Sequence, residues 1–217
     1  LRYAYEEKFL EGNYYRYSLG SDYPIVELKY AAGLPGILPR PYRSPKLDFS
    51  VSDYLNIAPL GNLYYNVFAG KIYGTLPFTL LQVPPGNNLY YYDKYSFDMM
   101  LRYEFLCDEY AGFNIEHEIG GGIFNYIPLL HKLKLRQFWT AKGIIGNLSQ
   151  ANIDLNFQGS SAFKTLQGNP YLELGTGVEN ILHFFRVDFV WRITPKPVKT
   201  DAYHKSFGVF GSVRLQF

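Results

Sequence analysis

The sequence predicts an all-β fold, an antiparallel transmembrane β-barrel of about ten strands. Apolar and polar residues alternate in segment after segment, at the roughly 9–11 residues with which a strand crosses a membrane. Aromatic residues make up 18% of the 217 residues, with 21 Tyr and 17 Phe. Such side chains are enriched in strands and at the boundary between water and lipid. No apolar run approaches the roughly 20 residues that a membrane-spanning helix needs.

The bulk composition narrows the classes of protein. The net charge is +2 with 18% charged residues, so no field of one sign indicates nucleic acid as a partner. The single cysteine, Cys107, cannot form an internal disulfide, which excludes a small disulfide-rich scaffold. Residues 1–217 are expected to form one domain. Because Leu1 begins within a strand-like pattern and no leader precedes it, we expect a processed or partial chain.

Period-two alternation is clearest at the C-terminus, in residues 207–217, and predicts a strand with one apolar face. A final aromatic residue preceded by apolar residues at alternate positions resembles the signal by which assembly machinery recognises nascent barrel strands. The alternative is an ordinary strand end that faces lipid. The residues of the predicted signal are Val213, Leu215 and Phe217.

The same alternation predicts the other strands, with boundaries uncertain by a few residues. Towards the N-terminus the pattern is weaker, but it keeps the same period. The expected strands cover, in chain order, residues near 1–9, 25–32, 47–57, 64–73, 97–105, 113–119, 133–145, 172–179 and 187–193.

The polar faces of these strands carry charges of both signs at mid-strand. A globular core would not bury so many charges without dense pairing, whereas a wet or salt-bridged lumen accepts them. Glu116 and Glu118 are expected to pair with Arg102, Lys134 or Arg136 on neighbouring strands. The predicted lumenal charge network comprises Arg102, Glu104, Glu116, Glu118, Lys134, Arg136, Glu173, Arg186, Asp188 and Arg192.

The connections fit a barrel with one exception. If the last strand ends on the periplasmic side, residues 181–184 form a tight periplasmic turn, and residues 147–170 and 195–206 form long external loops. Residues 74–95 would then form an unusually long periplasmic connection, on the same side as residues 120–132. Its prolines exclude a central strand. We expect this segment to fold into the lumen as a plug or to pack under the barrel.

Several motifs resemble known families of the outer membrane. Residues 170–180 (PYLELGTGVEN), residues 184–188 (FFRVD) and the terminal Phe217 resemble the last strands of the outer-membrane assembly and translocation barrels related to BamA and TamA. This resemblance implies a role in the assembly, insertion or transport of outer-membrane proteins.

A closer resemblance is to a family of uncharacterised outer-membrane proteins, whose members carry a carboxypeptidase-regulatory-like β-sandwich ahead of the barrel. It rests on residues 74–78 (GTLPF), 101–105 (LRYEF) and 126–134 (YIPLLHKLK). The resemblance covers roughly residues 45–217. It implies that this chain is the C-terminal portion of a larger barrel of about sixteen strands, without the upstream sandwich, and it implies no catalytic residue.

No enzymatic activity, cofactor or metal is expected. The chain lacks the Gly-x-Ser-x-Gly elbow of serine hydrolases, and its four histidines have no Ser/Asp pattern near them. Residues 120–122 are three glycines but lack the Gly-Lys-Ser/Thr of a phosphate loop. Acid–base work or Ca²⁺ binding by Glu116 and Glu118, or by Asp108 and Glu109, is less favoured than ion pairing.

Three functions remain open. The first is an outer-membrane barrel with an accessory role in assembly, insertion or transport, whose first and last strands meet at a seam that opens. The second is a passive pore or a structural outer-membrane barrel, and the third is a soluble β-barrel or sandwich that binds a ligand. The expected partners are outer-membrane lipid, the barrel-assembly machinery and other outer-membrane proteins as subunits of a complex.

Overall fold

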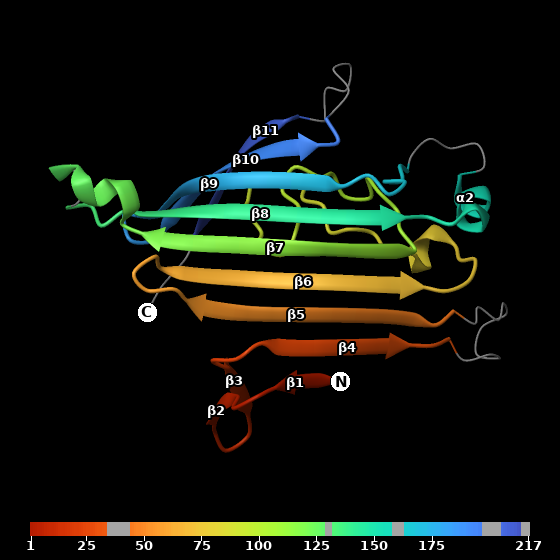
Figure 1. Cartoon of the computed structure of the whole chain (residues 1–217), viewed down its shortest axis with the longest axis horizontal. Coiled ribbons are helices and arrows are strands. Elements are labelled where there is room, and N and C mark those ends of the chain that lie inside the picture. Colours follow the sequence, from red (N-terminus) through yellow and green to blue (C-terminus); the bar gives the residue numbers. More distant parts are fainter. Residues whose placement is uncertain (34–43, 129–131, 158–162, 197–204, 214–217) are drawn as a thin grey trace.

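The chain is built around one antiparallel β-sheet of nine strands (Figure 1). The computed structural model describes residues 1–33, 44–128, 132–157, 163–196 and 205–213. The prediction of an all-β, mostly antiparallel fold is confirmed. In sheet order the strands are β1 (Arg2–Ala4), β4 (Ile25–Ala31), β5 (Lys46–Asn56), β6 (Asn62–Ile72), β7 (Glu109–Gly120), β8 (Arg136–Asn147), β9 (Tyr171–Ile181), β10 (Phe185–Thr194) and β11 (Phe207–Val213).

From β4 onward each strand pairs with the next one along the chain, so the sheet is a meander. The remaining elements lie in its connections. A hairpin of β2 (Lys8–Glu11) and β3 (Arg16–Gly20) joins β1 to β4. The other connections hold η1 (Phe78–Leu80), η2 (Gly122–Tyr126) and α2 (Gln150–Asn156).

Tight turns lie at one end of the sheet. Residues 57–61 join β5 to β6, and residues 182–184 join β9 to β10, as the sequence predicts for 181–184. Gly61 has a φ of +91°, and a Cβ there would lie 1.9 Å from the carbonyl oxygen of Glu118. Only glycine meets both conditions, because it has no Cβ and enters the left-handed region freely. The 57–61 turn therefore packs directly against the end of β7.

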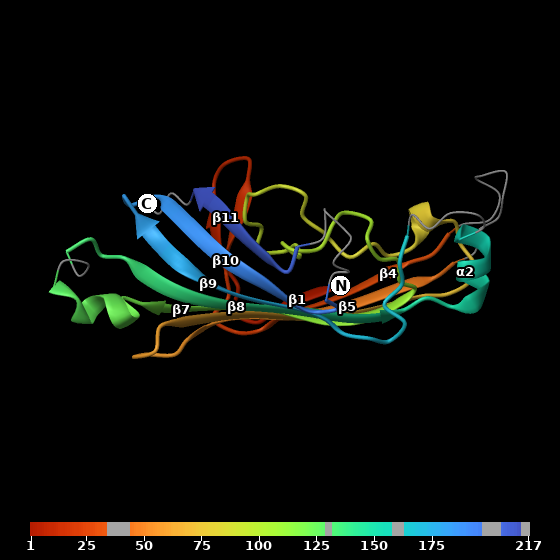
Figure 2. The ribbon, with the colours of Figure 1, turned by 90° about the horizontal axis from the view of Figure 1, so that it is seen from above.

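The sheet is curved, and a long segment lies in its concavity (Figure 2). Strands β9 to β11 turn up from the plane of β5 to β8. Residues 73–108, which connect β6 to β7 and which we term the insert, lie on the side towards which they turn. We call this side of the sheet the inner face and the opposite side the outer face. The expected plug-like segment 74–95 thus forms part of a longer insert on the inner face.

The strand predicted at residues 97–105 is wrong. These residues belong to the insert and form turns, in which the amide of Met100 donates to Phe97 and the amide of Glu104 to Leu101. Burial does not follow their alternation, because Asp98 and Glu104 are buried too and Tyr103 is 57% exposed. Phe97, Met100 and Phe105 are buried in a core cluster between the insert and the inner face.

Removing that strand corrects the predicted side of the insert. The insert leaves β6 and enters β7 at the end of the sheet that also carries the connections 148–170 and 195–206 (Figure 1). Residues 121–135 lie at the opposite end, with the tight turns. The exception that 74–95 had posed is therefore removed, but the end with the tight turns also carries the longer connections 5–24 and 121–135.

The sheet is open in the part of the chain that the structure describes. β1 and β11 stand at the two ends of its strand order and do not pair with each other there. The structure thus gives a curved antiparallel sheet, and a closed barrel is not found in it. In the described residues, no helix has the length and apolar character that crossing a membrane requires.

The two faces of the sheet differ in exposure and in charge, and the buried inner face also holds apolar side chains such as Phe138, Ile144 and Tyr171. On the outer face, apolar side chains are exposed, including Trp139 at 50%, Leu174 at 44% and Trp191 at 41%. On the inner face, charged side chains are buried under the insert, including Glu116 at 3% and Lys142 at 3%. The predicted alternation of apolar and polar faces is present in the strands, and the polar face is the buried one.

Candidate functional site

The candidate site is the contact between the insert and the charged inner face of β7 to β10, which we term the wall. Side chains of alternate residues in a strand point to the same face. This periodicity aligns Glu116 of β7, Lys142 of β8, Glu173 of β9 and Arg186 of β10 on the inner face, all buried. Burying a charge is costly unless it is paired and hydrogen-bonded. The partners of these four charges define the site.

Lys142 is the first anchor of the insert. Its Nζ donates to Asp98 Oδ2 at 2.7 Å and to the carbonyl oxygens of Asp93 and Ser96 at 2.7 and 2.6 Å. An ammonium group has three N–H donors, so the insert satisfies all of them. Only 4% of the Lys142 side chain and 1% of the Asp98 side chain are exposed. The pair is therefore shielded from solvent.

Glu173 holds the backbone of the same stretch. Its two carboxylate oxygens accept from the amides of Asp98 and Met99 at 3.0 and 2.7 Å, and the hydroxyl of Tyr171 also donates to it. One wall residue thus fixes the turn of the insert that carries Asp98.

Arg186 is the centre of a second cluster. Its Nη2 lies 2.8 Å from Asp188 Oδ1 and 2.9 Å from Glu116 Oε2. The Tyr92 hydroxyl of the insert donates to the same Glu116 oxygen at 2.8 Å. The Arg186 guanidinium also stacks on Phe138, 3.6 Å from the ring centroid. Burial raises the pKa of Tyr92 well above its ordinary value, so this tyrosine stays a neutral donor.

A third contact joins β10 to the end of the insert. Arg192 makes a bidentate pair with Glu104, at 2.9 and 3.2 Å, and its Nε donates to the carbonyl oxygen of Pro195 at 2.8 Å. The Glu104 carboxylate also accepts the amide of Leu101 at 3.1 Å. Bidentate geometry adds orientation to the charge attraction. Glu104 thus fixes the turn at residues 101–104 against the wall.

The two ends of the insert are tied to each other and to α2. Asn152, which is fully buried, accepts the amide of Leu76 at 2.8 Å and donates to Asp108 at 2.9 Å and to the carbonyl oxygen of Gly74 at 3.2 Å. Next to Asp108, burial raises the pKa of the Cys107 thiol to about 12, with the Asp108 charge as a smaller cause. The insert is therefore a closed loop fastened at its base and at three points of the wall.

The structure brings together six residues of the predicted charge network. Glu104, Glu116, Glu173, Arg186, Asp188 and Arg192 are all buried at the contact between insert and wall. The partner of Glu116 differs from the expected ones, because Arg186 binds it rather than a residue of the predicted set Arg102, Lys134 and Arg136. Glu104 also differs, since it reaches the network from the insert and not from a strand.

The other four residues lie away from the contact. Arg102 is exposed in the insert, Lys134 is exposed before β8, Arg136 is exposed at the start of β8, and Glu118 is half-buried near the end of β7. Of the predicted terminal signal, Val213 is 50% exposed on β11. Leu215 and Phe217 lie outside the described residues.

Sequence reasoning missed Lys142, Asp98 and Tyr92 as members of the site. For Lys142 the signal was available, because it lies on the polar face of β8 by the same alternation that selects the others. Asp98 was assigned to the polar face of a strand that does not exist. Tyr92 stands in the stretch Tyr90–Tyr91–Tyr92, and nothing in that stretch distinguishes the buried tyrosine from its neighbours.

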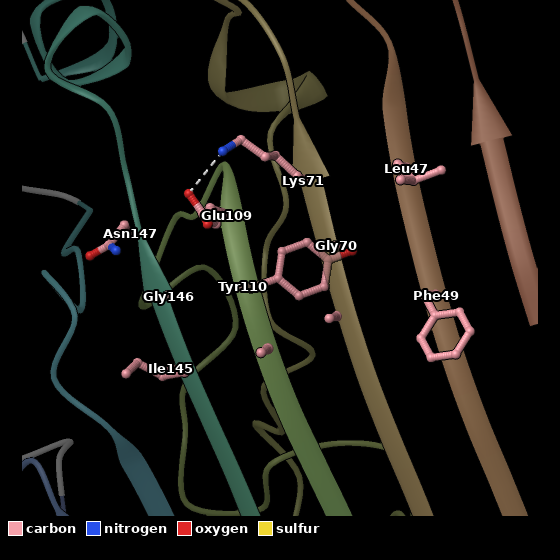
Figure 3. A pocket seen from close by; sticks show the side chains of 11 residues that line it. Leu47, Phe49, Gly70, Lys71, Glu109, Tyr110, Ile145, Gly146 and Asn147 are labelled. Carbon is pink, nitrogen blue, oxygen red and sulfur yellow. Dashed lines mark hydrogen bonds and ion pairs between the residues drawn. The ribbon is translucent and has the colours of Figure 1, made fainter.

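The outer face carries a hollow of about 410 Å³ near the end of the sheet where the long loops lie (Figure 3). Its floor consists of small side chains, because Ala69 of β6 pairs with Ala111 of β7 there. Phe49 and Ile145, the next residues in the same cross-strand row, form its sides. At its end Lys71 and Glu109 form an exposed ion pair at 3.3 Å. The hollow is thus apolar, with a charged rim.

The buried charges of the inner face are paired with groups of the insert and of neighbouring strands. The carboxylates of this face are occupied by lysine, arginine and backbone amides, and the described residues hold no group of three or more His, Cys, Asp or Glu side chains able to bind a metal ion. The arrangement fixes the insert on the inner face of the sheet.

The fold and the site define a class: an all-β protein in which a curved antiparallel sheet holds an insert on its charged face. A family model matches residues 1–178, and by this match the chain belongs to a family of unknown function (DUF5686), as its C-terminal domain. Comparison with curated proteins and with solved structures gave no match.

Proposed function

We propose that this chain is part of the wall of an outer-membrane β-barrel whose polar interior is closed by the insert. One observation carries the proposal. The exposed outer face is apolar, whereas the charged side chains of the sheet are buried on the inner face beside aromatic and aliphatic residues, an arrangement that suits lipid outside and protein inside. Strands β5 to β9 are 11 or 12 residues long, which is enough to cross a bilayer at the usual tilt.

The polar groups of the outer face support this arrangement by their positions. Lys71 is the last residue but one of β6, and Glu109 is the first residue of β7. His117 lies three residues from the end of β7. Charged side chains on a lipid-facing surface cost least near the membrane boundary. The apolar hollow beside Lys71 and Glu109 would be filled by lipid hydrocarbon.

The insert favours a barrel whose interior is blocked over a passive pore. Buried ion pairs hold it against β8 and β10, and its aromatic residues pack in the core between insert and wall. In this proposal, further strands outside the described residues extend the sheet from β1 around the insert, and the barrel has its seam at the edge of β11. An accessory role in the assembly, insertion or transport of outer-membrane proteins then suits the chain better than free conduction of solutes.

Site-directed fluorescence tests the orientation of the wall. Cys107 is buried, so a cysteine introduced into the full-length protein can be labelled selectively. A fluorophore at Leu174→Cys on the outer face should be quenched by brominated lipids, and one at Tyr14→Cys, 98% exposed on the hairpin, should be quenched by aqueous iodide. Quenching of both sites by iodide alone would refute the membrane assignment.

Two further measurements test the role. Planar-bilayer recording of the reconstituted protein should give no steady conductance, and a stable open channel would contradict closure by the insert. Depletion of the protein in cells should lower the levels of folded outer-membrane proteins, measured by heat-modifiable migration on gels. Normal levels of those proteins after full depletion would contradict the accessory role.

A further inference from the structure

The insert also reaches the last strand of the sheet. β11 stands at one end of the strand order and pairs with β10 on one side. On its other side, Tyr91 and Gly211 form a parallel bridge. The amide of Gly211 donates to the carbonyl oxygen of Tyr90 at 2.9 Å, and the amide of Tyr92 donates to the carbonyl oxygen of Gly211 at 3.1 Å. Residues 90–92 therefore occupy part of the edge of β11.

The register shows how much of this edge a longer strand would use. Gly211 is opposite Val187 of β10 and directs its backbone groups away from β10, towards the insert. In an antiparallel pair, hydrogen-bonded and non-hydrogen-bonded positions alternate, so Val209 and Val213 direct theirs the same way. An added strand would pair at all three positions. It cannot pair at Gly211 while residues 90–92 are bound there.

Two side chains hold this segment besides its contact with β11: the Asn87 amide, which donates to the carbonyl oxygen of Tyr91 at 2.7 Å, and the buried Tyr92. Tyr92 is 4% exposed, packs with Val190 and Phe210, and donates its hydroxyl to Glu116. Tyr90 and Tyr91 are 74% and 54% exposed. The backbone contact with β11 is thus short, and it is fastened at one end only by a buried side chain. Such a contact can be displaced without unfolding the ion-paired part of the insert.

We propose that the edge of β11 docks an extended client strand, and that residues 90–92 are a built-in competitor which must leave first. Unpaired strand edges bind extended peptides by main-chain hydrogen bonds. The side chains of β11 favour a client with alternating polarity, because Val209 and Val213 lie on the exposed outer face and Phe210 and Ser212 on the buried inner face. The client class rests on the proposed function, since such strands belong to outer-membrane proteins.

The test uses a disulfide lock in the full-length protein. In the variant Tyr91→Cys with Gly211→Cys, the bridge brings the two residues within the range that a disulfide spans. Space exists at position 211, because the nearest atom to a Cβ there is the Arg186 carbonyl oxygen at 3.8 Å. A matched control lock joins Leu10→Cys to Tyr17→Cys, which are cross-strand partners in the hairpin of β2 and β3.

The probe is a biotinylated peptide with the sequence of residues 185–194 and a photoreactive benzophenone. A second peptide contains the same residues in an order without alternation. We expect the oxidised lock to abolish photocrosslinking of the first peptide to β11, and reduction to restore it. Tyr92→Phe, which deletes only the bond to Glu116, should raise capture about tenfold, from the usual strength of a hydrogen bond to a charged group. Tyr90→Phe is its control and should leave capture unchanged.

The proposal is overturned if the disulfide does not form in the folded protein, if the locked protein captures the peptide as the native one does, or if the scrambled peptide binds equally well. These outcomes are separate from the membrane test. A protein that fails to insert into lipid contradicts the proposed function, whereas an inserted protein whose capture ignores the lock contradicts only this inference.

Discussion

Two ion pairs of equal length lie in opposite surroundings in this protein. Lys142 and Asp98 join the wall to the insert at 2.7 Å, with 4% and 1% of their side chains exposed. Lys8 and Asp22 lie 2.7 Å apart beside the hairpin, with 64% and 77% exposed. The same contact distance therefore says nothing about its contribution. Burial decides it, because a buried charge that loses its partner is left uncompensated, whereas an exposed one is solvated.

The difference divides the molecule into two regions. The insert and strands β7 to β10 form a region in which charges, aromatic rings and backbone bonds depend on one another. The hairpin of β2 and β3 carries exposed tyrosines and exposed ion pairs, such as Arg16 with Glu11 at 3.3 Å. The first region should resist change and exclude reagents, and the second should tolerate substitution.

The largest expected contrast is in thiol reactivity. The pKa of Cys107 is raised to about 12 by burial, so its thiolate fraction at pH 8 should be about a thousandfold below that of an exposed thiol. A maleimide should label Tyr14→Cys within minutes and leave Cys107 unlabelled until the protein is unfolded. Because the raised pKa favours the neutral thiol, this contribution to stability is present below about pH 8.5 and is lost as pH rises towards 12. Rapid labelling of native Cys107 would show that the insert opens readily.

Removing the central arginine should give the largest loss of stability. Arg186→Gln leaves Glu116 and Asp188 buried without their cation, and breaking a buried ion pair costs about 3–5 kcal/mol. The free energy of unfolding, from urea titration in detergent micelles, should fall by that amount. Arg16→Gln in the hairpin is the matched control. Equal effects of the two substitutions would remove the distinction between the regions.

A double-mutant cycle measures the buried pair between wall and insert. Lys142→Met and Asp98→Asn should each destabilise by about 3 kcal/mol, and the double variant by less than the sum. The coupling free energy should be about 1–3 kcal/mol, as for residues in one network. Additive losses would mean that Lys142 acts through the carbonyl oxygens of Asp93 and Ser96 and not through Asp98. That outcome would weaken the idea that an ion pair anchors the insert.

Period-two alternation predicted the wall well because geometry enforces it. Successive side chains of a strand point to opposite faces, and here the two faces meet different surroundings. Residues 187–193 and 172–179 were therefore placed correctly in β10 and β9. The same pattern misled at residues 97–105. A segment that folds through turns can carry the same alternation in its sequence, because here the polar residues Asp98 and Glu104 bind the inner face and are buried like Phe97 and Phe105.

The charge network shows the same limit from the other side. Alternation selects Glu116, Glu173 and Arg186 as residues of one face, but it cannot say which charges meet. Arg186 is 70 residues from Glu116, and Arg192 is 88 residues from Glu104. Those pairings depend on sheet curvature and on the path of the insert. Neither is encoded in a local period, which is why Tyr92 was missed, whereas the period itself places Lys142 on the same face as the other charges.

The smallest expected effect completes the comparison. The cycle of Lys8→Met and Asp22→Asn deletes a pair as short as the one between Lys142 and Asp98, with chemically identical substitutions. Exposed pairs gain little because water and salt screen them and both side chains lose freedom. We expect no shift of the urea midpoint beyond replicate error, and no coupling, at low or high salt. A coupling free energy comparable to that of the buried pair would mean that the hairpin packs against a surface absent from the described residues. Only burial at such a surface would make the Lys8–Asp22 pair as strong as the one between Lys142 and Asp98.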